Sequence, residues 1–175
     1  MSDKNLILVD QDTLELPPFG KAPALRIEMD KIREAESRLI EAKTVNPSTY
    51  TDLEYSFNEA YRDLKRHLSS IGYRLIMAEK DLEEAKANVL LGSYAEFMKG
   101  KTKTQDNADL RKAFMVKNPE YCAAFDRIAQ LRALESNFDG KIKVMERVCA
   151  YMKVQMNLII RGGLSGSDLY VTKHK

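Results

Sequence analysis

Tryptophan is absent from this chain, and glycine and proline are scarce, with 8 and 5 residues among 175. Folds made only of strands depend on such residues for their turns, so their scarcity argues against an all-β protein. Apolar runs are short as well. None approaches the ~18 residues of a membrane-spanning helix, and the run at residues 6–9 is too short for a signal peptide. We therefore expect a cytoplasmic protein with no membrane segment.

Residues that carry catalytic or metal chemistry are also few. The two histidines, His67 and His174, and the two cysteines, Cys122 and Cys149, lack the spacing of a zinc site. No glycine-rich segment has the lysine and the context of a phosphate-binding loop. The cysteines lie in helical patterns, which is typical of small core residues in a reducing compartment. We expect no enzymatic activity, no metal and no cofactor.

Charged residues, by contrast, are abundant. They make up 31% of the chain, beside 44% hydrophobic residues, a balance typical of long helices with a narrow apolar stripe. The 28 basic and 26 acidic residues nearly cancel, to a net charge of +2. Any nucleic-acid site must therefore come from local clustering of basic residues. A length of 175 residues predicts one domain.

The clearest pattern lies at residues 48–91, where apolar residues alternate at spacings of four and three. This spacing predicts a long helix that packs against another helix through more than four heptads. Its seam comprises Phe57, Tyr61, Leu64, Leu68, Ile71, Leu75, Ala78, Leu82, Ala85 and Val89. A shorter helix is predicted at residues 23–45, from the seven-residue recurrence of Leu25, Ile32 and Leu39, and it ends before Pro47.

A second long helix is predicted at residues 119–161. Asn118 is its expected N-cap, and Gly162 and Gly163 are expected to end it, leaving residues 164–175 as a flexible tail. Its apolar positions again alternate by four and three over Phe138, Ile142, Met145, Cys149, Met152, Met156 and Ile159.

These elements predict an all-α fold, an elongated antiparallel helical hairpin or coiled-coil-like bundle. It has an extended N-terminal arm at residues 1–22, a helical domain at 23–163 and a flexible C-terminal tail. So slim a unit leaves apolar surface exposed, which favours a homo-oligomer. The residues expected to form the core or oligomer seam are Leu68, Ile71, Leu75, Leu82, Met145 and Met152.

The arm has two interpretations. Two prolines at 17–18, together with Gly20 and Pro23, exclude a helix, and residues 6–9 resemble a short strand. The arm is either a loose terminus or a segment that packs on another subunit through Leu6, Ile7, Leu8 and Phe19.

The segment between the long helices, residues 92–118, is called the tip below. Its glycines and polar residues predict a loop, followed by a short helix at residues 110–116. It combines basic and aromatic residues, the combination that single-stranded nucleic acid requires, since lysines contact phosphates and rings stack on bases. The expected contact residues are Lys99, Lys101, Lys103, Arg111, Lys112, Tyr94 and Phe97. A second basic cluster lies on the last helix, at Lys141, Lys143, Arg147, Lys153 and Arg161. The alternative is that the lysines serve solubility and that the rings form a local core.

Four segments between residues 50 and 163 form a pattern. They are Glu83 to Asn88, the aromatic turn from Tyr94 to Lys101, Met115 to Lys117, and a last helix that contains Cys149 and closes at Gly162-Gly163. Through these segments the chain resembles the UvsY-like recombination mediator family of T4-like phages. The chain departs from the family in its longer amino end. The basic pair that the family places before the aromatic turn also has no clear counterpart, and Lys99 and Lys101 are the nearest substitutes.

The resemblance implies a homo-oligomeric ring that binds single-stranded DNA. It also implies that the protein helps to load a RecA-like recombinase in place of single-strand-binding protein, in DNA recombination and repair. Two other functions are consistent with the same heptad pattern and involve no binding of nucleic acid. One is a phage structural or scaffold protein, or a coiled-coil adaptor. The other is an inhibitor that binds a host or defence protein through the tip.

Overall fold

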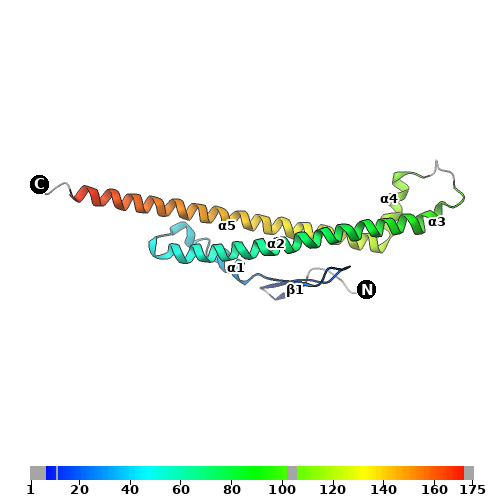
Figure 1. Cartoon of the computed structure of the whole chain (residues 1–175), viewed down its shortest axis with the longest axis horizontal. Coiled ribbons are helices and arrows are strands. Elements are labelled where there is room, and N and C mark those ends of the chain that lie inside the picture. The colour runs from blue at the N-terminus through cyan, green and yellow to red at the C-terminus, as the bar shows by residue number, and fades with distance from the viewer. Residues whose placement is uncertain (1–6, 11, 102–105, 172–175) are drawn as a thin grey trace. The chain divides into compact units, whose positions relative to one another are not determined.

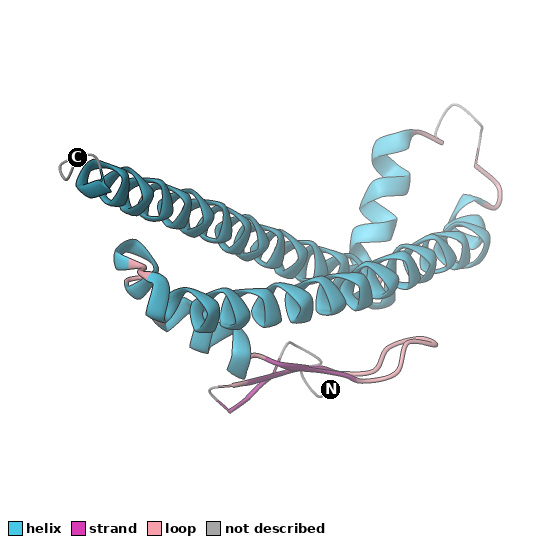
Figure 2. Cartoon of the chain, turned by 60° about the vertical axis from the view of Figure 1, so that its left-hand side comes forward, coloured by secondary structure: helices cyan, strands magenta, loops and turns pink. Residues whose placement is uncertain are grey.

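The computed structural model describes residues 7–10, 12–101 and 106–171, and the side chains of residues 12–101 and 106–162. It confirms the predicted helical hairpin, since two long helices dominate the chain, α2 (Pro47–Val89) and α5 (Pro119–Val171) (Figure 1). A small three-stranded sheet with the order β1-β2-β3 is an addition to the predicted fold (Figure 2).

The remaining elements are short. They are β1 (Ile7–Asp10), β2 (Thr13–Leu16), β3 (Leu25–Glu28), α1 (Asp30–Ser37), the 3₁₀-helix η1 (Glu41–Thr44), the π-helix η2 (Leu90–Tyr94), α3 (Ala95–Met98) and α4 (Ala108–Lys117).

The chain divides into two compact units, and α2 and α5 contribute to both. Unit 1 includes Glu15–Arg26 and Ser69–Ser136, and unit 2 includes Ile27–Leu68 and the chain from Asn137 onward. Each unit has its own core.

In unit 2, the first half of α2 packs against the second half of α5. Its fully buried side chains include Phe57, Leu64, Phe138 and Met145. The ring of His67 meets that of Phe138 edge to face, with centroids 6.3 Å apart. Lys153 pairs with Glu54 at 3.7 Å. Later residues of α5 thus meet earlier residues of α2, which shows that the two helices run antiparallel.

In unit 1, the second half of α2 packs against the first half of α5. Ile71, Ala78 and Leu131 are almost completely buried. Across the helix pair, the guanidinium of Arg132 donates a hydrogen bond of 2.9 Å to the carboxylate of Glu79. This unit also holds the tip and the segment between β2 and β3.

The buried stripe of α2 differs from the predicted seam at every second position. Phe57, Leu64, Ile71 and Ala78 are buried, but Leu68, Leu75 and Leu82 are only half-buried. The residue just before two of these leucines is buried instead, His67 at 5% exposure and Arg74 at 3%. The buried stripe is rotated around α2 towards His67 and Arg74, two polar residues that a hydrophobic pattern does not include. Both contact the segment that precedes α1. The other two seam positions, Met145 and Met152, are fully buried.

The helix predicted at residues 23–45 is wrong at both ends, because residues 25–28 form β3 and α1 ends at Ser37, before the separate 3₁₀-helix η1. Leu25-Arg26-Ile27-Glu28 alternates apolar and polar side chains, and only Ile27 is buried, which is the periodicity of a strand with one covered face. The helix itself begins at Asp30 and buries Ile32 and Ala35. Ala42 is buried in η1.

Asparagine caps begin both long helices. The Asn46 side chain accepts hydrogen bonds from the backbone N–H groups of Ser48 and Thr49, and that of Asn118 accepts one from the N–H of Tyr121. The predicted end of the last helix is wrong, because α5 continues past Gly162 to Val171. Gly162 does not adopt a positive φ, and a glycine costs a helix only about 1 kcal/mol relative to alanine.

The arm also differs from its intersubunit interpretation. Phe19 is 7% exposed and buried within its own chain, so it is not available to another subunit. Leu6 and the side chains of residues 7 and 8 lie outside the described part. None of the described helices is long and apolar enough to cross a membrane.

The rotated stripe predicts unequal costs for two truncations four residues apart. Ile71→Ala should lower the free energy of unfolding by about 2–5 kcal/mol, because it leaves a cavity in a closed core. Leu75→Ala should lower it by only about 1 kcal/mol, because the side chain is already partly exposed. Urea denaturation of the two variants measures the difference. Equal losses would contradict the rotated stripe.

The buried imidazole of His67 predicts a dependence of stability on pH. Its Nε2 lies 3.2 Å from the carbonyl oxygen of Glu28. Burial, followed by the charge of Arg66, lowers its pKa below the ordinary 6.5, against smaller opposing effects of Glu28 and Asp63. The unfolded chain therefore binds more protons below pH 6.5, and the free energy of unfolding should fall as pH drops from 6.5 towards the folded pKa.

His67→Gln keeps a hydrogen-bond donor for the Glu28 carbonyl but cannot titrate. Urea denaturation between pH 7 and about pH 5 should show a smaller loss of stability for this variant than for the native chain. The same loss in both proteins would mean that His67 does not cause it.

Candidate nucleic-acid interface

The tip is more helical than the sequence predicted. Gly92 does not end α2, because the chain passes through the π-helix η2 directly into α3. The turn comes at Gly100, whose φ of +79° favours glycine. Further on, α4 is capped by Asn107, whose side chain accepts a hydrogen bond from the N–H of Leu110. The short helix predicted at residues 110–116 therefore exists, with slightly wider bounds.

The π-helix decides which aromatic residue turns inward. A π turn contains one residue more than an α turn, so it rotates the residues that follow it about the helix axis. After Val89, an uninterrupted α-helix would bring Ser93 to the buried face. The extra residue brings Tyr94 there instead, and its ring is 5% exposed.

Three rings form a cluster inside the tip. The centroid of Tyr94 lies 5.2 Å from that of Phe114 and 6.5 Å from that of Phe97, and Phe97 lies 4.8 Å from Phe114. Only Phe97 shows substantial surface, at 40% exposure. The cluster is a small local core with one ring at its edge.

Asp106 connects this core to α4. It accepts hydrogen bonds from the hydroxyl of Tyr94 and from two guanidinium nitrogens of Arg111, the Nε bond measuring 2.7 Å. These donors, Arg111 first, lower the pKa of Asp106 to about 2, and Asp106 in turn raises the pKa of Tyr94. The carboxylate thus stays charged across the physiological range and neutralises Arg111.

The lysines of the tip differ in how they are engaged. Lys99 pairs with Glu96 one helical turn earlier. The ammonium of Lys101 lies over the ring of Phe97, 2.8 Å from its centroid. Lys112 and Lys117 are exposed, and neither has an ion-pair partner in the part of the chain that the structure describes. Lys103 lies outside the described residues.

Apart from Lys99, which is paired with Glu96, and Lys103, the predicted contact residues therefore fall into two groups. Tyr94 is buried and Arg111 is bound to Asp106, so neither offers a free group to a nucleic acid, and the expectation that Tyr94 stacks on a base is corrected. Phe97, Lys101 and Lys112 are accessible, and Phe97 and Lys101 are in direct contact. The sequence could not show that Asp106 neutralises the arginine, because five residues separate the two.

The basic cluster on α5 is partly neutralised too. Lys141 pairs with Glu36, Lys143 with Asp139 and Lys153 with Glu54. Among the described residues, Arg147 and Arg161 have no ion-pair partner. This cluster therefore offers fewer free cations than its sequence suggests.

Neither cysteine is placed for chemistry. Cys122 and Cys149 are both free and half-buried, and burial raises the pKa of the Cys149 thiol, which opposes its conversion to a reactive thiolate. Within the described residues, no three His, Cys, Asp or Glu side chains come together in a way that could hold a metal ion.

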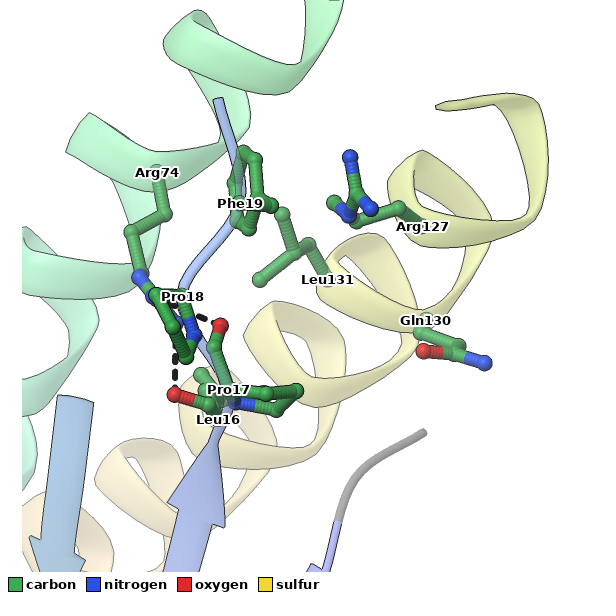
Figure 3. A pocket seen from close by; sticks show the side chains of 8 residues that line it. All are labelled: Leu16, Pro17, Pro18, Phe19, Arg74, Arg127, Gln130 and Leu131. Carbon is green, nitrogen blue, oxygen red and sulfur yellow. Dashed lines mark hydrogen bonds between the residues drawn. The ribbon is translucent and has the colours of Figure 1, made fainter. Parts of the chain in front are cut away.

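Sequence reasoning missed a cluster in unit 1 formed by Arg74, Phe19 and Arg127 (Figure 3). The guanidinium of Arg74 donates hydrogen bonds to three backbone carbonyls, of Leu16 at 3.3 Å, of Pro17 at 3.0 Å and of Pro23. It also lies 5.0 Å from the centroid of the Phe19 ring, and the guanidinium of Arg127 lies 4.3 Å from the same centroid. Burial lowers the pKa of both arginines.

The turn between the strands fits closely against α2. Gly20 has a φ of +47°, and a Cβ at this position would clash with the carboxylate of Asp81. The cavity beside Phe19 measures about 20 Å³, which is room for roughly one water molecule. This cluster therefore anchors the N-terminal segment and is too small for a ligand.

Arg74→Ala should lower the free energy of unfolding by about 3 kcal/mol, because the buried carbonyl of Leu16 and the part-buried carbonyls of Pro17 and Pro23 lose their donor, at roughly 1–3 kcal/mol for a fully buried group and less for the other two. Arg74→Lys should lose less, because an ammonium reaches some of the same carbonyls without the planar fork. The exposed surface pair of Arg62 gives the control, and Arg62→Ala should stay within about 1 kcal/mol of the native chain in the same urea titration. A native-like Arg74→Ala would contradict the anchor.

In comparisons with known proteins, no family model, no curated protein and no solved structure matches the chain.

Proposed function

We propose that this protein is an oligomeric single-stranded-DNA-binding protein, and that the tip provides its contact surface. The observation that carries the proposal is the pair formed by Phe97 and Lys101, an exposed ring with an ammonium over its face. An aromatic face is a sequence-tolerant platform for a base, and lysines close to it contact the phosphates on either side.

The pair supports a simple exchange on binding. The ammonium of Lys101 occupies the face of Phe97 by a cation–π contact, worth about 0.5–1 kcal/mol at an exposed site. Stacking of a base on such a ring is worth about 1–3 kcal/mol. A base therefore displaces the ammonium, which then becomes free to bind a phosphate, while Lys112 and Lys117 are already free to do so.

The rest of the tip serves to hold this platform. Phe97 packs against Phe114, which holds the ring of Phe97 in place when no DNA is bound. Asp106 joins the buried Tyr94 to Arg111 of α4. A platform whose geometry exists before binding loses less conformational entropy when a strand arrives.

In the cell the protein acts as a recombination mediator. This part of the proposal rests on the resemblance to the UvsY-like family, in which such proteins help to load a RecA-like recombinase where single-strand-binding protein covers the DNA. An oligomer suits that role, because several weak contacts on one strand add up to tight binding that can still be passed on stepwise.

The second candidate is a structural or coiled-coil adaptor protein that binds no nucleic acid. It is favoured by the exposed apolar residues on α5, such as Val154, Leu158 and Ile160, which are 52–58% exposed. Both candidates predict self-association, and only the first predicts salt-dependent binding of oligonucleotides.

Lys101→Ala combined with Lys112→Ala should weaken the binding of a labelled single-stranded oligonucleotide and flatten its salt dependence. Each lost phosphate contact should make the log–log slope against salt about 0.7 less negative, so the pair should change it by about 1.4. Phe97→Ala should instead lower the affinity with little change in slope, since stacking releases no counterions. Fluorescence anisotropy at several salt concentrations measures both quantities.

The matched control is Lys21→Ala combined with Lys80→Ala, two exposed lysines outside the tip that have no ion-pair partner among the described residues, and it should leave the slope unchanged. If the native protein binds no more tightly than about 100 μM at low salt, or if the tip variant and the control variant behave alike, the DNA-binding proposal fails and the adaptor function takes its place.

A further inference from the structure

Unit 2 has an open groove between η1 and α5, to which the proposed function assigns no role. The groove measures about 630 Å³ and is lined by Leu39, Ala42, Lys43, Arg147, Val148 and Tyr151. A volume of this size is within the range of pockets that bind ligands. Tyr151 is 43% exposed, so part of its ring is available to an occupant of the groove.

The floor of the groove is apolar. Leu39 and Val148 are half-buried, and Ala42 is buried. The hydroxyl of Tyr151 is already engaged, because it donates a hydrogen bond of 3.4 Å to the backbone oxygen of Lys43. A nucleobase on this floor would leave polar edge atoms without partners, which is unfavourable. An apolar side chain has no such atoms and therefore fits the floor better.

The rim of the groove is positively charged. Lys43 lies on the side of η1 and Arg147 on the side of α5, and both are exposed. Neither has an ion-pair partner in the part of the chain that the structure describes. An occupant that brings negative charge to the rim would neutralise both residues, which favours an acidic partner.

The acidic residues around the groove leave this positive charge in place. Those on the neighbouring turns already form ion pairs with other basic residues. The pairs are Glu36 with Lys141, Glu41 with Arg38, and Asp139 with Lys143. Glu146 precedes Arg147 in the sequence but lines a different groove, together with Cys149 and Lys153.

The length of the groove restricts the kind of acidic partner. On α5 it extends from Arg147 to Tyr151, roughly 6 Å at 1.5 Å per residue, which is little more than one helical turn. A packed helix pair extends over many turns, as α2 and α5 themselves do. The groove therefore suits a short segment better than a long helix. A second copy of the same face is disfavoured, because it would bring like charges together.

We propose that this groove binds a short acidic peptide segment of a partner protein. A large apolar side chain of the segment lies on the floor, against Leu39 and Tyr151, and carboxylates beside it pair with Lys43 and Arg147. The planar guanidinium of Arg147 suits a carboxylate, because it can donate two parallel hydrogen bonds to the two oxygens. The inference goes beyond the proposed function and does not depend on DNA binding.

A displayed library of random short peptides, selected on the full-length protein, tests the inference. The enriched peptides should carry aspartate or glutamate beside a large apolar residue. A labelled copy of the most enriched peptide is then titrated by fluorescence anisotropy. Arg147→Glu should weaken its binding about tenfold or more, because the reversal places like charges together. Tyr151→Ala should weaken it as well, whereas Tyr151→Phe keeps the ring and should bind as the native protein does.

Arg161→Glu is the matched control. Arg161 is also an exposed arginine of α5 without an ion-pair partner among the described residues, and it lies outside the groove. It is roughly 21 Å from Arg147 along the helix, about twice the distance over which salt screens exposed charges. The control should bind the peptide as the native protein does, and circular dichroism verifies that each variant remains helical.

The inference is overturned if the library enriches no acidic peptides. It is overturned as well if Arg147→Glu binds the enriched peptide as tightly as the native protein, or if Arg161→Glu weakens binding equally. Two other occupants are recognised with the same variant. If Arg147→Glu leaves the peptide affinity unchanged but lowers the mass in light scattering, the groove binds a second copy. If it lowers only the affinity for a single-stranded oligonucleotide, the groove binds the strand.

The result is separable from the DNA-binding proposal. Lys101→Ala combined with Lys112→Ala changes the tip and leaves the groove intact, so this variant should bind the peptide as tightly as the native protein. A protein that binds acidic peptides through Arg147 but binds no oligonucleotide supports the groove and refutes the DNA-binding proposal. A protein that binds oligonucleotides through the tip and enriches no acidic peptides refutes the groove alone.

Discussion

The hydrogen bonds donated by the guanidinium of Arg74 are the interaction on which residues 16–23 of unit 1 depend. Residues 16–23 contain three prolines and a glycine, so they form few backbone hydrogen bonds of their own, and their carbonyls need donors from elsewhere. One arginine on α2 supplies three of them and places its charge against the ring of Phe19. In unit 2, His67 meets the carbonyl of Glu28 in the same manner. Two polar residues, seven positions apart, thus take places that an ordinary coiled coil gives to leucine.

This explains how far the sequence could predict the fold. The alternation of four and three located both long helices, and Phe57, Leu64 and Ile71 are buried. It assigned Leu68 and Leu75 to the same seam because a hydrophobic pattern assumes an apolar partner. Here the partner includes backbone carbonyls, for which histidine and arginine are the better side chains. The strand at Leu25–Glu28 was missed because Leu25 fits the seven-residue recurrence of Ile32 and Leu39, which is typical of a helix. The alternation of apolar and polar residues that indicates a strand is only four residues long here.

The tip shows the same limit for charges. Counting lysines and arginines along the sequence indicates a strongly basic segment, but ion pairs remove part of that charge. Arg111 is held by Asp106 and Lys99 by Glu96, so the free cations are fewer and lie elsewhere than the count suggests. The aromatic residues divide likewise into a buried member, Tyr94, and an accessible one, Phe97. Which ring becomes accessible depends on a single turn of helix, and residue composition carries no information about it.

That turn, η2, also makes the length of the tip independent of the length of the paired helices. A π turn accommodates one extra residue without a break in the helix. A helix can therefore absorb the insertion of one residue as a π turn, while the residues before and after it stay on the same sides of the helix as before. Below the turn, Val89 stays in register with the helix pair, and above it Tyr94 stays in register with the aromatic cluster. A change of one residue in the length of the tip therefore leaves the paired helices unaltered, so the surface of the tip can change independently of the scaffold that carries it.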